Sequence, residues 1–237
     1  MLNGCDTGGL PTHLVKPLVD NHDIPFFIET GTASGESARL AATMFQQVYT
    51  IEVIEERAEI KDAPHNIYFL RGDSAELLPH IIEDISKYKC DKEHQFALFY
   101  LDAHYSGDTP NESGYPECPL LDEIRSVAKY GEDAIIIIDD ARLFFGQTPY
   151  PHDPREWPSI CEIFILLKEC FPHHYITITD DYVLAIPIHV REVIDKEWRD
   201  RFDIRYPNAE DKLRGQVKDV HKAFMEKVYE PFLNYIK

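Results

Sequence analysis

Short apolar runs rich in β-branched and aromatic residues constrain the fold of this chain more than any other feature. They lie at 26–29, 48–53, 67–71, 96–102 and 134–139. All five are apolar on both faces, which is typical of strands in a parallel sheet that helices cover on each side. The pattern therefore predicts repeated strand–helix–strand units.

Helical patterning appears between these runs. Segment 74–89 opens with SAEL and repeats leucine and isoleucine at helical spacing. Segment 34–46 is rich in alanine and starts with serine. Helices are also expected over 54–61, 120–130 and 157–170.

Two further apolar runs, at 175–179 and 183–188, are divided by Asp180 and Asp181. So short a connection predicts a hairpin, which makes the final strand antiparallel to its neighbour. The expected fold class is α/β: a doubly wound, Rossmann-like, seven-stranded and mostly parallel sheet, with a C-terminal antiparallel hairpin and a helical tail.

The chain has 237 residues, enough for one large domain with appendages. We expect an N-terminal extension over 1–25, a central domain over 26–189 and a C-terminal helical extension over 190–237. Apolar residues in the last part recur every three or four positions and need a partner surface, either the domain's own flank or a second copy in a homodimer. They are Leu213, Val217, Val220, Phe224, Val228 and Phe232.

The chain carries 42 acidic and 24 basic residues, a net charge of -18. Such an acidic body repels phosphate groups, so we expect neither nucleic acid nor an anionic membrane surface as a partner. The five cysteines include no CxxC pair, and the N-terminus lacks the features of a signal peptide. No apolar run is long enough to span a bilayer. These features predict a cytoplasmic protein with free thiols.

The stretch FFIETGTASGES, at 26–37, is a strand followed by a glycine turn. It lacks the GxGxxG of dinucleotide-binding turns and the GK[ST] of a P-loop. The acidic Glu29 before the turn would repel phosphate, which favours a ligand with a neutral or cationic centre. Glu52 ends the next strand, where a carboxylate can accept hydrogen bonds from ribose hydroxyls. Asp73 and Ser74 end the third, where they could reach an adenine edge.

The ordered motifs E-x-G-x-x-x-G, a strand ending in Glu52, GDS, LDAH and a final hairpin resemble those of class I S-adenosylmethionine-dependent methyltransferases. The resemblance covers about 26–188 and makes 26–189 the methyltransferase domain. It implies that the glycine turn faces the methionine part, with Glu29 near the sulfonium, that Glu52 holds the ribose, and that Asp73 and Ser74 hold the adenine. The implied cofactor-binding residues are Glu29, Thr30, Gly31, Thr32, Gly35, Ser37, Glu52, Val53, Asp73, Ser74 and Asp102.

Aspartates end the fourth and fifth predicted strands, at Asp102, Asp139 and Asp140. Their positions resemble the metal ligands of O-methyltransferases of the catechol O-methyltransferase type. This resemblance implies Mg²⁺ or another divalent cation that would bind a substrate hydroxyl. Strand-ending aspartates can also simply cap the next turn, with Asp102 touching only the cofactor.

That family has a lysine as base where this chain has Tyr105. His104 is the better candidate for a general base, because histidine titrates near neutral pH, and Tyr105 could position the substrate. The predicted catalytic residues are therefore Asp102, His104 and Tyr105. Loops 104–119 and 141–158 would form the pocket of a small polar acceptor, such as a sugar or a phenol. The alternatives are a nicotinamide-dependent oxidoreductase on a similar sheet and a non-catalytic module that binds the cofactor.

Overall fold

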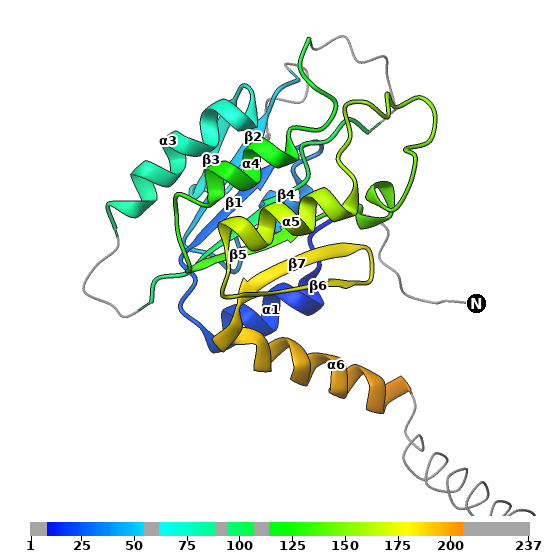
Figure 1. The fold of residues 1–237 in the computed structure, drawn as a ribbon. Coiled ribbons are helices and arrows are strands. Elements are labelled where there is room, and N and C mark those ends of the chain that lie inside the picture. Colours follow the sequence, from blue (N-terminus) through cyan, green and yellow to red (C-terminus); the bar gives the residue numbers. More distant parts are fainter. Residues whose placement is uncertain (1–8, 55–61, 89–93, 107–113, 206–237) are drawn as a thin grey trace, which may run out of the picture. The chain divides into compact units, whose positions relative to one another are not determined.

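The computed structural model describes residues 9–54, 62–88, 94–106 and 114–205. Its seven strands form one sheet in the order β3-β2-β1-β4-β5-β7-β6 (Figure 1). The strands are β1 (Phe26–Thr30), β2 (Gln47–Glu52), β3 (Ile67–Arg71), β4 (Ala97–Leu101), β5 (Ala134–Ile138), β6 (His174–Thr179) and β7 (Tyr182–Pro187). The first five pair in parallel, whereas β7 is antiparallel to both β5 and β6. The predicted fold class is confirmed.

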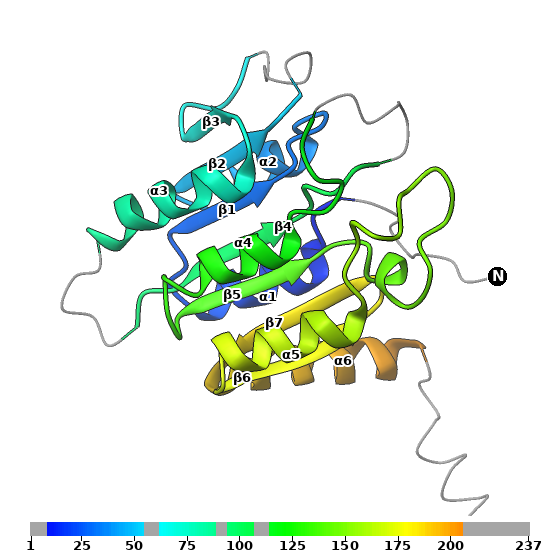
Figure 2. The same cartoon turned by 45° about the horizontal axis from the view of Figure 1, so that its top comes forward.

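Helices cover both faces of the sheet, as Figures 1 and 2 show. On one face lie α3 (Ser74–Ser86), α4 (Leu120–Val127) and α5 (Ile160–Cys170). On the other lie α1 (Thr12–Asn21) and α2 (Glu36–Ala41). Two 3-10 turns, η2 (Ala141–Phe144) and η3 (Ile188–Val190), follow β5 and β7, and α6 (Arg191–Arg205) comes last. The chain divides into two compact units, Met1–Ile194 and Asp195–Lys237.

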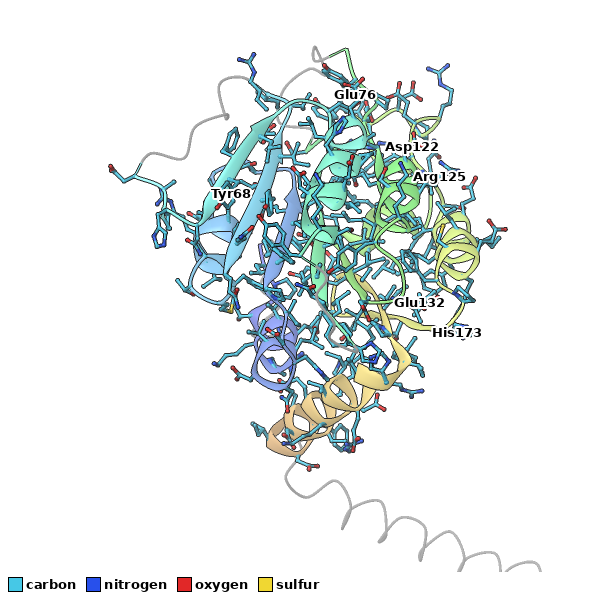
Figure 3. All side chains as sticks on the ribbon, turned by 90° about the vertical axis from the view of Figure 1, so that its left-hand side faces the viewer. Tyr68, Glu76, Asp122, Arg125, Glu132 and His173 are labelled. Atoms are coloured by element: carbon cyan, nitrogen blue, oxygen red, sulfur yellow. The ribbon has the colours of Figure 1, made fainter. Side chains whose placement is uncertain are left out.

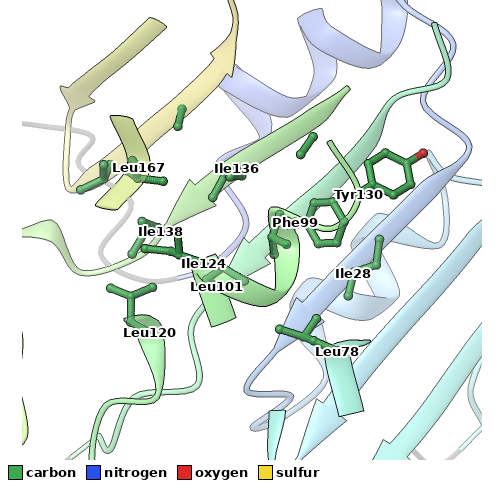
Figure 4. Packing of buried hydrophobic residues seen from close by; sticks show 14 of the residues in the cluster. Ile28, Leu78, Phe99, Leu101, Leu120, Ile124, Tyr130, Ile136, Ile138 and Leu167 are labelled. Carbon is green, nitrogen blue, oxygen red and sulfur yellow. The ribbon is translucent and has the colours of Figure 1, made fainter. Parts of the chain in front are cut away.

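The central strands β1, β4 and β5 are buried at every position, because helices pack on each side of them. On the face of α3, α4 and α5, side chains from these strands and helices form one continuous core (Figure 4). Its members include Ile28, Leu78, Phe99, Leu101, Ile124, Ile136, Ile138 and Leu167. This packing fixes the strands in register and so fixes the groups at their ends.

Several helix boundaries differ from the prediction. Helix α2 covers only Glu36–Ala41 of segment 34–46, because Gly35 precedes it in a left-handed conformation and the chain turns tightly after Ala41. Helix α5 starts at Ile160 rather than at position 157, since Ser159 caps it and forms a capping box with Glu162.

Helix α1 was not predicted at all, although its Leu14, Val15 and Leu18 are fully buried. Most of the helix predicted over 54–61 and the apolar stripe from Leu213 to Phe232 lie outside the described residues. None of the described helices combines the length and the apolar character needed to cross a bilayer.

Candidate functional site

The parallel register brings the ends of neighbouring strands to one edge of the sheet. Thr30 at the end of β1 pairs with Ile51 in β2 and with Leu101 in β4, and Leu101 pairs with Ile138 in β5. We call this the carboxyl edge. It brings together the predicted acidic residues, which lie at or just beyond the strand ends: Glu29, Glu52, Asp73, Asp102, Asp139 and Asp140. Open α/β sheets bind ligands at such an edge.

Gly31 allows the turn after β1 to lie directly against the backbone that follows β4. Its φ is +83°, and a Cβ atom there would lie 2.2 Å from the carbonyl oxygen of Asp102. Its N–H donates to the carbonyl of Ile51 at 2.9 Å. Only glycine combines this conformation with so close an approach. The glycine turn is thus locked between β2 and β4.

Glu29 is almost fully buried, with 1% of the residue exposed. Its carboxylate accepts a hydrogen bond of 2.6 Å from the hydroxyl of Thr50, which in turn contacts the hydroxyl of Thr32 at 2.6 Å. Burial raises the pKa of Glu29 to about 8, the Thr50 hydrogen bond opposes this, and the charge of Glu52 adds to it. A cation near Glu29 would favour its charged form.

Glu52 joins the glycine turn to the end of β2. One carboxylate oxygen accepts from the N–H of Ala33 and the other from the N–H of Ile54, each at 2.9 Å. Val53 lies between these contacts along the chain. Because a carboxylate oxygen has two lone pairs, each oxygen of Glu52 can accept one more hydrogen bond, which fits a diol such as that of ribose.

Asp73 caps helix α3, and its carboxylate accepts from the N–H of Ala75 at 2.9 Å. The neighbouring Ser74 is buried at the first position of the helix. At α2, Gly35 occupies the N-cap position and Ser37 follows in the first turn. Both helices therefore begin at the carboxyl edge, where their N–H groups favour polar ligand atoms.

His104 bridges the ends of β4 and β5. Its Nε2 lies 2.9 Å from Oδ2 of Asp140, and its Nδ1 lies 3.5 Å from Oδ1 of Asp102. Trp157 packs edge-on against the imidazole, with ring centroids 5.4 Å apart. Burial alone would raise the pKa of Asp140, but His104 and then Arg142 lower it below its ordinary value. The imidazole is therefore held by a charged carboxylate.

Tyr105, the other predicted catalytic residue, is half-buried beside His104 in the chain. Its N–H donates to the carbonyl of Glu117 at 2.7 Å, and its ring packs edge-on against His152.

Two of the predicted metal ligands, Asp139 and Asp140, already have protein partners. One oxygen of Asp139 accepts from the hydroxyl of Tyr100 and the other from the N–H of Asp140. Asp140 is paired with His104 and with the guanidinium of Arg142. Within the described ranges, no group of three or more His, Cys, Asp or Glu side chains is arranged to hold a metal ion. The predicted metal site thus has no support there, and we derive no step from a metal.

Glu123 is a candidate site residue that sequence reasoning missed. It lies on α4 with 1% of the residue exposed, and its Oε1 has no hydrogen-bond partner among the described residues. Burial raises its pKa to about 7, which the hydroxyls of Ser74 and Thr30 partly offset. It lines a cavity of about 10 Å³ together with His104, Ala103 and Cys118. Its neighbours Asp122 and Arg125 instead form an exposed ion pair (Figure 3).

The sequence did contain a signal for Glu123, since position 123 lies between the core residues Leu120 and Ile124 on the apolar side of the helix.

Burial and the charges of Asp139, Asp140, Glu29 and Glu123 raise the pKa of Asp102 well above its ordinary value. A carboxylate-rich edge of this kind favours ligands that bring positive charge.

Comparisons with known proteins give structural neighbours only. No family model and no curated protein matches the sequence. A solved structure of human methyltransferase-like protein 13 with S-adenosylhomocysteine is 11% identical, with 80% of this chain and 93% of that chain covered and a TM-score of 0.47.

An S-adenosylmethionine-dependent methyltransferase from Anabaena variabilis is 15% identical over 75% of this chain and 80% of its own, with a TM-score of 0.43. The N-methyltransferase NodS from Bradyrhizobium japonicum, with S-adenosylhomocysteine, is 13% identical over 73% and 82%, with a TM-score of 0.41. By their names, all three of these structures are methyltransferases.

Proposed function

We propose that this protein is an S-adenosylmethionine-dependent methyltransferase that methylates a hydroxyl oxygen of a small polar acceptor of the sugar or phenol kind. One observation carries the proposal: the acids Glu29, Glu52, Asp73 and Asp102 lie at or just beyond the ends of the parallel strands β1 to β4, at one edge and around a glycine turn. Their order along the chain is the order that the resemblance requires.

Within this proposal, the four acids serve three tasks. Glu52 accepts hydrogen bonds from the ribose hydroxyls while it keeps the glycine turn in place. Asp73 and Ser74 face the adenine edge at the start of α3. Glu29 and Asp102 place carboxyl groups close to the turn, where the positive sulfur of the ligand would lie and would favour their charged forms. The residues thus bind and orient the methyl donor.

The donor supplies a methyl group on a positively charged sulfur, and the acceptor oxygen takes this methyl as the carbon–sulfur bond breaks, its electron pair remaining on sulfur. His104 accepts the proton of the acceptor hydroxyl at Nδ1, whose distance to Asp102 is too long for a hydrogen bond. Asp140 holds the other ring nitrogen and fixes the direction of the imidazole. Tyr105 helps to position the acceptor.

Calorimetry with S-adenosylhomocysteine and with NAD tests the cofactor assignment. We expect S-adenosylhomocysteine to bind and NAD not to bind. Glu52→Gln should weaken S-adenosylhomocysteine about tenfold or more, because a neutral amide replaces a carboxylate that accepts hydrogen bonds from the diol.

The exposed acid Asp122 on α4 supplies a matched control, and Asp122→Asn should leave the affinity unchanged. Binding of NAD alone would indicate an oxidoreductase. Binding of S-adenosylhomocysteine without methyl transfer to any hydroxyl acceptor would indicate a cofactor-binding module. If neither ligand binds, the proposal is wrong.

A further inference from the structure

Glu117 connects the two loops that follow β4 and β5, at 104–119 and 141–158, of which positions 107–113 lie outside the described residues. It is buried, with 7% of the residue exposed. Its Oε2 accepts from Nε1 of Trp157 at 2.8 Å and from the N–H of Asp153 at 2.9 Å. Its own N–H donates to Oε2 of Glu156 at 2.8 Å. One residue thus makes three hydrogen bonds from the first loop to the second.

Trp157 carries this connection to the proposed base. The indole ring is buried, and its N–H group points at the carboxylate of Glu117. Its ring contacts His104, with centroids 5.4 Å apart, and also contacts Phe144 and His152. The same indole ring thus contacts His104 and donates to Glu117.

A buried carboxylate that joins two loops is energetically less favourable than apolar packing between them. Desolvation of the charge costs free energy that the two N–H donors only offset, whereas apolar packing carries no such cost. Nδ1 of His152 lies 3.8 Å away and makes no hydrogen bond within the described part of the chain. What a carboxylate adds over an apolar residue is direction, because it fixes the donor atoms of Trp157 and Asp153 at one point.

We propose that Glu117 is a positioning residue of the acceptor site, which joins the two loops and holds Trp157 against His104. The inference deepens the proposed function and rests on it, since the acceptor site is defined by the role of His104 in methyl transfer. Glu117 itself touches neither the reacting atoms nor the cofactor.

The two hydrogen bonds that the carboxylate of Glu117 accepts determine which variants test its role. Both end on the same oxygen, so the amide oxygen of Glu117→Gln can accept both. Glu117→Leu has a similar size and accepts neither. Glu117→Asp keeps the charge but is one methylene too short to reach both donors, and it replaces Glu117→Leu if that variant does not fold.

Fluorescence of Trp157 gives the readout. The chain has two tryptophans, so Trp198→Phe leaves Trp157 as the single tryptophan. An imidazole in contact with an indole changes the emission of that indole, so His104→Gln should change the emission of Trp157 at one fixed pH. The size of this change is the His104 share, and it is measured in the parent and in each Glu117 variant.

We expect Glu117→Gln to keep the His104 share and Glu117→Leu or Glu117→Asp to lose at least half of it. Arg155→Ala removes an exposed ion pair with Asp153 in the same loop and should change nothing. The role of Glu117 is overturned if Glu117→Leu or Glu117→Asp keeps the full share, or if Glu117→Gln loses as much.

Binding of S-adenosylhomocysteine separates the two possible failures. Its affinity should be the same in the Glu117 variants and the parent, because Glu117 lies in the acceptor loops. A parent chain that does not bind it refutes the proposed function, whereas an unchanged His104 share refutes the role of Glu117.

Discussion

The carboxyl group of Glu29 lies inside the end of the sheet, hydrogen-bonded to Thr50. Because its pKa is raised to about 8, most molecules carry a protonated Glu29 at pH 7. A nearby cation lowers that pKa, so binding of a cationic ligand and loss of this proton are linked.

We therefore expect S-adenosylmethionine to displace a proton from Glu29 at pH 7. Affinity should rise by up to about tenfold between pH 7 and pH 9 and then level off above the pKa of free Glu29. Calorimetry in buffers of different ionisation enthalpy measures the protons released. Glu29→Gln should reduce their number, whereas Asp102 can still release a proton, and a parent chain that releases none would contradict the linkage.

Gly31 offers a second test at the scale of one residue. Gly31→Ala places a Cβ atom 2.2 Å from the carbonyl oxygen of Asp102, so the backbone after β1 or β4 must shift. We expect a loss of about 1–3 kcal/mol in the free energy of unfolding, measured with urea. A Cβ atom at Gly146 would meet no other described atom within 4 Å, and the backbone there is not left-handed. Gly146→Ala is the control, and equal losses in both variants would refute the close approach.

At the scale of elements, the sequence predicted strands better than helices. Strands such as β5 are apolar throughout, and no other element explains so short a run. Helix ends depend on single contacts, such as the cap at Ser159, which set the true start of α5. Helix α1 escaped prediction because the segment is short and Pro17 interrupts it.

The residues of the candidate site also differ in how well the sequence predicted them. Residues at strand ends, such as Glu52 and Asp73, could be placed because parallel strands end together. Glu117 could not, because its burial depends on how a loop packs against distant parts of the chain, and its residue type is typical of the surface. Glu123 was missed as well, although its position on the apolar side of α4 did indicate burial.

The N-cap residue of α5 offers a test that concerns the stability of this one helix. Ser159→Ala removes the hydroxyl that accepts from the N–H of Glu162 and should cost about 1 kcal/mol in the free energy of unfolding. Ser159→Thr retains the hydroxyl and should lose much less. Binding of S-adenosylhomocysteine should not change in either variant, and a weaker affinity would mean that α5 shapes the cofactor site.

At the scale of the whole molecule, the N-terminal segment is part of the first compact unit. Helix α1 buries three apolar side chains. His13 contacts Asp180 at 3.0 Å, and the carbonyl of Gly9 accepts from the hydroxyl of Tyr182 at 3.0 Å. Residues near the start of the chain are thereby joined to the hairpin of β6 and β7.

We expect Leu14→Ala to lower the free energy of unfolding by about 2–5 kcal/mol, because Leu14 is fully buried. Leu40 on α2 is 40% exposed, and Leu40→Ala should cost much less. Thermal and urea unfolding of both variants measure the difference. If the two substitutions cost the same, α1 does not contribute to the core as described.

Strand β7 lies between β5 and β6, although it is the last of the seven to be made. A growing chain that has reached only Cys170 has no neighbour for the outer side of β5, whose isoleucines and unpaired backbone groups are then open to other molecules. The partly synthesised chain is therefore prone to aggregation until residue 187 has emerged. Holdase chaperones should protect the chain during that interval, and slow translation near the hairpin should increase aggregation because it prolongs the interval.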